Sequence, residues 1–195
     1  MLNQTRTIPR LGMSLSDLLV YTQLIQAQST LLHRHNFIEF FCVLNGSCTH
    51  VVNGEEKNLL PGDAFLLFPE DCHIMTNPSE NFTHRDVLID LKYFEKVCSV
   101  YSGDFYGFFH ANAAKQTYMT TEQIHDIENC VVTLFEPHSD KREINACSIV
   151  TRVINLFLQD MTNTTKNIPR WLIQLSQYLS NPQSFHEDLQ VIMVV

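Results

Sequence analysis

Three side chains that could bind a metal ion lie close together in the chain: His33, His35 and Glu39. Their spacing would put them on one face of an extended strand, because side chains two residues apart in a strand point the same way. A fourth candidate, His73, follows after a run of short apolar segments and turns. Such ligands suit one divalent metal ion, and they do not distinguish Zn, Ni, Fe or Mn. The alternative is a polar pocket floor, where the same groups hydrogen-bond a bound molecule or one another.

Two phenylalanines share the parity of these residues. Phe37 and Phe41 would point to the same side of the strand as the candidate ligands. An aromatic ring at such a position could stack on the ring of a small-molecule effector. The plainer interpretation is that both rings fill the core, as most strand aromatics do.

The elements that must position these groups are short strands between residues 31 and 90. Asn-Gly dipeptides at 45–46 and 53–54 supply the positive φ of tight hairpin turns. Residues 64–68 form a short, wholly apolar run, which is typical of a strand covered on both faces. Many short strands punctuated by Gly and Pro predict a β sandwich or barrel of the jelly-roll kind.

Beyond residue 90 the apolar spacing changes to that of helices. Apolar residues from 91 to 101 and from 124 to 135 fit two helices, the second preceded by a capping box at Thr120 and Gln123. A third helix, with Asp140 as its N-cap, carries a wide apolar stripe that could pack on the wall of the β domain. Part of this stripe is formed by Val150, Val153, Ile154 and Phe157.

The candidate ligands belong to two motifs that resemble those of cupins, a family of small β-barrels. The first motif is matched by His33, His35, Glu39 and Gly46. The second is matched by Gly62, Pro69, His73 and Asn77. Pro69 comes one residue late, and Asp71 stands where a glycine is usual. The resemblance implies a cupin jelly-roll barrel in which the four ligand positions hold a metal ion in metal-binding members.

The segments 33–46, 50–73 and 88–96 together resemble the effector-binding half of AraC-family transcription regulators. The resemblance extends over residues 15–195 and is closest to regulators of chitobiose and cellobiose utilisation. It implies a mainly β fold with C-terminal helices. Residues 1–90 would form the barrel with its N-terminal arm, and residues 91–160 a helical segment that packs on it and dimerises. The partners it implies are a small-molecule effector, a disaccharide or its phosphate, and a second copy in a homodimer bound through Val150, Val153, Ile154 and Phe157.

The C-terminal part resembles the start of a DNA-binding domain. Residues 161–168 are polar and read as a linker. Residues 169–195 resemble the beginning of the AraC-type helix-turn-helix domain, and they end before its recognition helix. Because that helix reads the major groove, we expect DNA binding only in a full-length protein. The chain is then a fragment of a longer regulator or the product of an interrupted gene.

Composition excludes several classes of partner. The net charge is −8, and the 13 Lys and Arg residues are scattered, so we expect no nucleic-acid binding by the chain itself. The first residues lack the apolar core of a signal peptide, and no apolar run is long enough to span a bilayer. These features predict a cytoplasmic protein without membrane association. Six cysteines without a C-x-x-C pair fit reduced, buried thiols.

Three functions are compatible with these features. The organisation favours the sensing and dimerisation part of a sugar-responsive regulator, and no enzymatic activity. The alternative is a small metal-dependent cupin enzyme, an isomerase or dioxygenase, that uses the ion as a Lewis acid. Its ligands are present, but no separate acid or base is evident, and residues 140–195 have no role in it. A non-catalytic binding or storage cupin has the same weakness.

Overall fold

The computed structural model describes residues 6–7, 19–101, 104–113, 115–135 and 141–162. Chain contacts divide the protein into two compact units, residues 1–162 and 163–195, and every described residue belongs to the first. The predicted helix-turn-helix start at 169–195 lies outside the described residues, as do most of the N-terminal arm and of the linker at 161–168. The first two residues of that linker end the last described helix.

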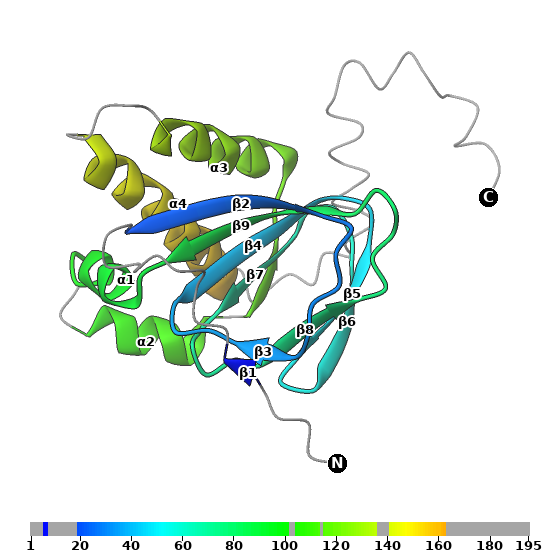
Figure 1. Cartoon of the computed structure of the whole chain (residues 1–195). Coiled ribbons are helices and arrows are strands. Elements are labelled where there is room, and N and C mark those ends of the chain that lie inside the picture. Colours follow the sequence, from blue (N-terminus) through cyan, green and yellow to red (C-terminus); the bar gives the residue numbers. More distant parts are fainter. Residues whose placement is uncertain (1–5, 8–18, 102–103, 114, 136–140, 163–195) are drawn as a thin grey trace. The chain divides into compact units, whose positions relative to one another are not determined.

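The described residues form two five-stranded sheets, which we call sheet A and sheet B (Figure 1). Sheet A has the order β1 (Arg6–Thr7), β3 (His33–Arg34), β8 (His73–Thr76), β5 (Cys48–Val52) and β6 (Glu55–Leu59). Sheet B has the order β10 (Gln116–Tyr118), β7 (Asp63–Leu67), β4 (Ile38–Asn45), β9 (Thr83–Ile89) and β2 (Val20–Gln26). All pairs are antiparallel except β1 with β3. The prediction of a mainly β, jelly-roll fold with C-terminal helices is confirmed.

Four helices in the described part of the chain cover the face of sheet B that points away from sheet A (Figure 1). They are α1 (Leu91–Cys98), α2 (Phe105–Asn112), α3 (Thr121–Leu134) and α4 (Arg142–Thr162). The predicted capping box of α3 is confirmed, because the Gln123 N–H donates to Thr120 Oγ1 and the Thr120 N–H donates to Gln123 Oε1. None of the described helices combines the length and the apolar character that crossing a membrane requires.

Two apolar cores flank sheet B. The inner core lies between the sheets and consists of Phe41, Val43, Cys48, Val52, Leu59, Phe65, Leu67, Met75 and Phe82. The outer core lies between sheet B and the helices, where the Phe40 and Phe157 rings meet edge to face. Strand β7 is buried along its whole length, as the apolar run at 64–68 predicts.

The four residues that the resemblance assigns to dimerisation lie in the outer core. They are Val150, Val153, Ile154 and Phe157, and none has any exposed surface. The apolar stripe of α4 therefore packs on sheet B, as the alternative interpretation predicts. The role of these four residues in dimerisation stays a prediction.

The Asn-Gly turns occur where the sequence predicts them. Gly46, Asn53 and Gly54 all have positive φ, between 51° and 88°. At Gly46 there is also no room for a side chain, because a Cβ would lie 2.5 Å from Ser79 Oγ and 2.6 Å from the backbone of Phe82. The turn after β4 thus packs against the loop that leads into β9.

Candidate metal and effector site

The four candidate ligands come together from two sheets, so the single strand predicted for three of them is wrong. His33 in β3 is paired directly with His73 in β8, and both belong to sheet A. Glu39 lies in β4 of sheet B, and His35 lies in the crossing between β3 and β4, in neither strand. The parity of His33, His35 and Glu39 still predicted correctly that their side chains point to one side, because the two sheets face the same interior.

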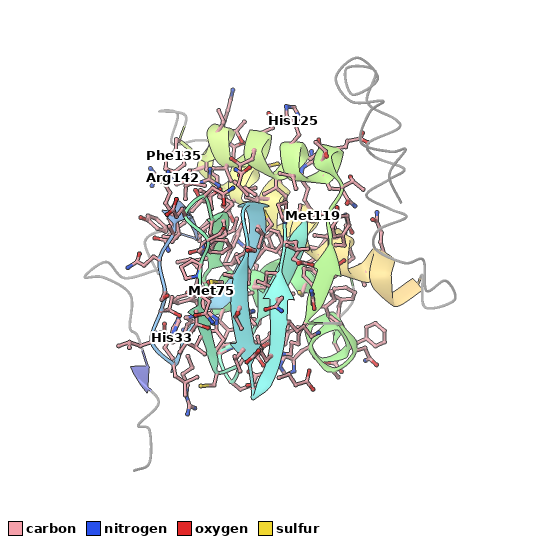
Figure 2. All side chains as sticks on the ribbon, turned by 90° about the vertical axis from the view of Figure 1, so that its right-hand side faces the viewer. His33, Met75, Met119, His125, Phe135 and Arg142 are labelled. Carbon is pink, nitrogen blue, oxygen red and sulfur yellow. The ribbon has the colours of Figure 1, made fainter. Side chains whose placement is uncertain are left out.

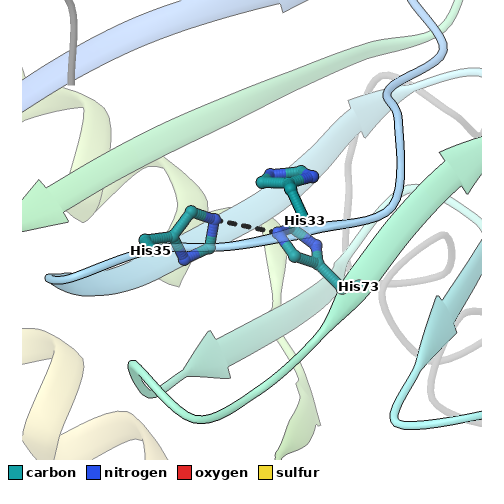
Figure 3. A group of neighbouring side chains, drawn as sticks. All are labelled: His33, His35 and His73. Carbon is teal, nitrogen blue, oxygen red and sulfur yellow. Dashed lines mark hydrogen bonds between the residues drawn. The ribbon is translucent and has the colours of Figure 1, made fainter. Parts of the chain in front are cut away.

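The side chains of His33, His35 and His73 meet inside the barrel (Figure 3), and the Glu39 carboxylate contacts His35. Possible ligand atoms of His33, His35 and His73 all lie within 4.8 Å of one another. His35 Nε2 is 2.9 Å from His73 Nε2 and 2.6 Å from Glu39 Oε2. Each of the four residues is at most 7% exposed. The structure therefore forms a buried cluster of three imidazoles and one carboxylate.

Hydrogen bonds decide which ring nitrogens face the centre of this cluster. His33 Nδ1 donates to the Leu31 carbonyl oxygen at 2.7 Å, which leaves the lone pair on Nε2. An ionised carboxylate only accepts, so the proton in the short His35–Glu39 contact lies on His35 Nε2. His73 Nε2 faces that protonated nitrogen at 2.9 Å, where a second N–H would oppose the first, so His73 directs its Nε2 lone pair there. Both His33 and His73 thus offer Nε2 lone pairs.

Burial sets the charge of the cluster. It lowers the pKa of His73 to about 3 and the pKa of His33 below its ordinary value, so both rings are neutral at neutral pH. Burial acts to raise the pKa of Glu39, but the hydrogen bond from His35 and the other imidazoles hold it below its ordinary value. Neutral imidazoles beside a carboxylate are the protonation states that metal binding requires.

The donors fit a divalent transition metal ion, although the three imidazoles are not equally prepared for it. The Nδ1 atoms of His33 and His73 have hydrogen-bond partners, Leu31 O and His50 Nε2. His35 Nδ1 is buried and has no hydrogen-bond partner in the part of the chain that the structure describes. Coordination through His35 Nε2 would require its proton to leave or to move to that unpaired nitrogen. Metal ligation by the four residues stays a prediction.

A second polar group lines the same interior on sheet B, and the sequence analysis did not find it. His84 Nε2 lies 3.2 Å from Asp86 Oδ1, and Gln23 Nε2 donates to Asp86 Oδ2 at 2.8 Å. Burial raises the pKa of Asp86. The signal that could have found it is the alternation in β9, whose residues 84 and 86 pair with Val43 and Phe41 of β4.

The two aromatic residues predicted to contact an effector have different surroundings. Phe37 is buried and stacks on His35, with 4.6 Å between ring centroids. Phe41 has no exposed surface, stacks on Phe65 at 5.2 Å and meets the edge of His50. Both rings therefore lie beside polar groups of the interior, and their role in effector binding stays a prediction.

Asp71, which stands where the second cupin motif usually has glycine, anchors the turn before His73. Its Oδ2 accepts hydrogen bonds from the Phe68 N–H at 2.8 Å and from Lys115 Nζ at 2.7 Å. Its Oδ1 accepts from Asn53 Nδ2 at 2.8 Å. The turn before His73 is thus fixed by hydrogen bonds to the Asp71 carboxylate.

Three solved structures illustrate the distant structural similarity of this chain to known proteins. KdgF from Halomonas sp. is 19% identical, with a TM-score of 0.34, and the match covers 36% of this chain and 68% of KdgF. A cupin protein from Bacteroides fragilis is 18% identical, with a TM-score of 0.32, and the match covers 37% of this chain and 64% of that one. ToxT from Vibrio cholerae is 12% identical, with a TM-score of 0.48, and the match covers 84% of this chain and 71% of ToxT.

Comparison at the level of sequence is more informative. No protein with a curated description matches the chain. The family model described as the AraC-like ligand binding domain matches residues 17–154. The matched region contains both sheets except β1, helices α1 to α3, the four candidate ligands and most of α4. The chain therefore belongs to the family of AraC-like ligand binding domains.

Proposed function

We propose that this chain is the ligand-sensing part of a transcription regulator and that a small molecule binds inside its barrel. Membership of a ligand-binding family supports this role. The observation that carries it is a set of buried ring nitrogens that have no hydrogen-bond partner among the described residues: Nδ1 of His35, His50 and His84. Buried polar groups are normally paired, so these atoms favour an interior that binds a polar molecule.

A divalent metal ion is the first occupant we propose. His33, His35 and His73 would hold it through imidazole nitrogens, with the Glu39 carboxylate beside them, as their spacing within 4.8 Å supports. The ion, Zn, Ni, Fe or Mn, would supply a positive charge that attracts an oxygen atom of the effector. The protein's part is to keep His33 and His73 neutral and to exclude water from the cluster.

A disaccharide or its phosphate is the effector we propose. The sequence resemblance to chitobiose and cellobiose regulators supports the compound class. The chemistry of the interior is compatible with it, because the Phe41 and Phe65 rings offer apolar surface beside the polar atoms of His84 and Asp86. Hydroxyl groups both donate and accept, so they can pair with imidazole and carboxylate groups alike.

The response would pass from the barrel to the helices through β9. This strand holds Asp86 on its inner face, and on its outer face Arg85 donates two hydrogen bonds to Glu128 of α3. A ligand that moves β9 would therefore act on α3, which packs on α4. In a full-length cytoplasmic regulator that binds DNA as a homodimer, this movement would alter how the two copies engage DNA.

An enzyme is the second candidate, and the three-histidine cluster is the observation that favours it. A metal-dependent isomerase or dioxygenase of the cupin type would use the same ligands. Against it, Glu39 is already engaged by His35, and the unpaired groups are equally suited to binding. Turnover of a disaccharide, detected by product analysis after incubation with the metal-loaded protein, would favour the enzyme.

The test combines elemental analysis of the purified protein with thermal unfolding in the presence of chitobiose, cellobiose and their phosphates. A sugar that binds the folded state should raise the melting temperature, by an amount equivalent to roughly 2.7 kcal/mol at 100 times its Kd. The Asp86→Asn variant should lose this response, whereas Glu56→Gln, on the exposed strand β6, should keep it. No response to any of these sugars, with or without Zn, Ni, Fe or Mn, would rule out the proposed effector class.

A further inference from the structure

His50 is a further buried histidine of the interior, besides the three candidate ligands and His84, and neither cupin motif contains it. It lies in β5 with no exposed surface, and its Nε2 is 3.0 Å from Nδ1 of His73. In the sheet, His50 is paired with Met75 and His73 with Val52, so the two imidazoles are diagonal neighbours on the inward face. The register of β5 against β8 therefore brings the two rings together.

The His50 ring packs against two aromatic neighbours that stack on each other. Its plane is nearly perpendicular to those of Phe41 and Phe65, with ring centroids 5.1 Å and 4.7 Å away. These edge-to-face contacts leave little freedom to the ring. A fixed ring can hold its hydrogen-bond partner in one orientation, and a mobile ring cannot.

The direction of the hydrogen bond follows from the rest of the cluster. His73 Nε2 faces the protonated Nε2 of His35 at 2.9 Å, so a neutral His73 carries its proton on Nδ1. That Nδ1–H donates to His50 Nε2, and the His50 proton then lies on Nδ1. We propose that His50 is a positioning residue, which accepts the Nδ1–H of His73 and so keeps the His73 Nε2 lone pair directed at His33 and His35.

This inference rests on the proposed metal function where it concerns affinity. A metal-bound imidazole is oriented by the acceptor of its other N–H, and loss of such an acceptor typically lowers metal affinity about 10- to 100-fold. His33 has the Leu31 carbonyl oxygen in that role, and His73 has His50. His50 would therefore raise metal affinity without touching the ion.

The experiment measures Ni²⁺ and Zn²⁺ affinity by chelator competition on the full chain. His50→Leu removes the acceptor and should lower affinity about 10- to 100-fold. His50→Gln can accept through its amide oxygen and should stay close to the unmodified protein. Met75→Leu is the matched control, because Met75 belongs to the inner core and is paired with residue 50 in the sheet; Figure 2 labels its side chain. Equal losses in His50→Leu and Met75→Leu would overturn the proposal.

A readout that needs no metal separates this inference from the proposed function. Nitrogen-15 NMR of the metal-free protein reports which nitrogen of each imidazole is protonated. We expect His73 protonated on Nδ1, His50 on Nδ1, and a coupling across the bond between them. A proton on His73 Nε2 would overturn the positioning role. If the protein binds neither metal but His73 has its proton on Nδ1, the metal function fails and the positioning of His73 by His50 stands.

Discussion

The two faces of sheet B are both buried, and they are built from opposite chemistry. Along β4, Phe40 points outward into an apolar core, and Glu39 points inward to His35. Along β9, Val87 points outward and Asp86 inward. Apolar surface stabilises wherever it is closely packed, whereas a buried polar group costs free energy unless it is paired. The apolar outer face thus contributes most of the free energy of unfolding. The polar groups of the inner face lower the free energy of unfolding, and they are the groups that can bind a ligand.

The largest effect should come from the outer face. Phe40 has no exposed surface and contacts the Phe157 ring across the core between sheet B and α4. Phe40→Ala should lower the free energy of unfolding by about 3–5 kcal/mol, because it removes a buried ring and leaves a cavity. Chemical denaturation followed by circular dichroism measures this value. Val100→Ala is the control, since Val100 is 81% exposed and its loss should change stability by less than about 0.5 kcal/mol. Similar values for the two variants would contradict the assignment.

The sequence pattern predicted that the four candidate ligands lie together, which the structure shows, but the single strand predicted for three of them is wrong. Alternation predicts which residues face one side, and it places His33 and Glu39 in the same interior even though they lie in different sheets. The sheet crossing at His35 depends on how the barrel closes, which no local pattern encodes. Helix α2 and strand β10 were not predicted, because α2 contains a glycine among aromatics and β10 has only three residues.

Two further limits have the same physical origin. The apolar stripe around Val150 and Phe157 shows that a helix face is covered, and sequence alone does not say by what. The structure covers it with sheet B. The inward direction of Asp86 depends on the register of β9 against β4, which is set by long-range pairing. The motif residues could be predicted because their spacing is local. The group formed by Asp86, His84 and Gln23 could not be predicted, because Gln23 is distant in sequence from the other two.

The next effect should come from the inner histidines as pH falls. Burial lowers the pKa of His50 to about 4 and that of His73 to about 3, both below the ordinary 6.5. At pH values below 6.5 and above these lowered pKa values, the two histidines are protonated in the unfolded chain but not in the folded one. Their contribution to stability is therefore fully present above pH 6.5 and is lost as the pH falls. From pH 7 to 5 the metal-free protein should lose on the order of 2–3 kcal/mol, with proton uptake by Asp86 offsetting part of the loss.

Denaturation at a series of pH values in a chelating buffer measures this slope. His50→Gln removes one of the two shifted groups and should make the slope clearly shallower. Phe40→Ala should lower the whole curve without changing its slope, because it removes no titrating group. A slope that is the same in His50→Gln and in the unmodified protein would show that the inner histidines do not set the pH dependence.

A smaller effect of opposite sign should come from the carboxylate of the inner face. Burial raises the pKa of Asp86, so its charged form weakens folding at neutral pH. Asp86→Asn keeps the shape and removes the charge, and it should stabilise the ligand-free protein by roughly 1 kcal/mol at pH 7. The gain should vanish below the ordinary pKa of aspartate, where the native residue is protonated in both states. A loss of stability at pH 7 would mean that His84 and Gln23 compensate the buried charge fully.

The smallest effect should lie where the two faces are joined. Arg85 Nε and Nη2 donate to Glu128 Oε1 and Oε2 at 2.7 and 2.8 Å, which ties β9 to α3. A double-mutant cycle with Arg85→Met and Glu128→Gln should give a coupling of about 0.5 kcal/mol, because the pair is bidentate but partly exposed. The cycle for Lys96 and Glu143, whose side chains are 68% and 61% exposed at the same 2.7 Å separation, should give none that is measurable. If β9 carries the response to the effector, the Arg85–Glu128 coupling should change when a sugar is bound and the Lys96–Glu143 coupling should not. An Arg85–Glu128 coupling that is identical with and without bound sugar would show that binding at the inner face is not transmitted through β9 to the helices.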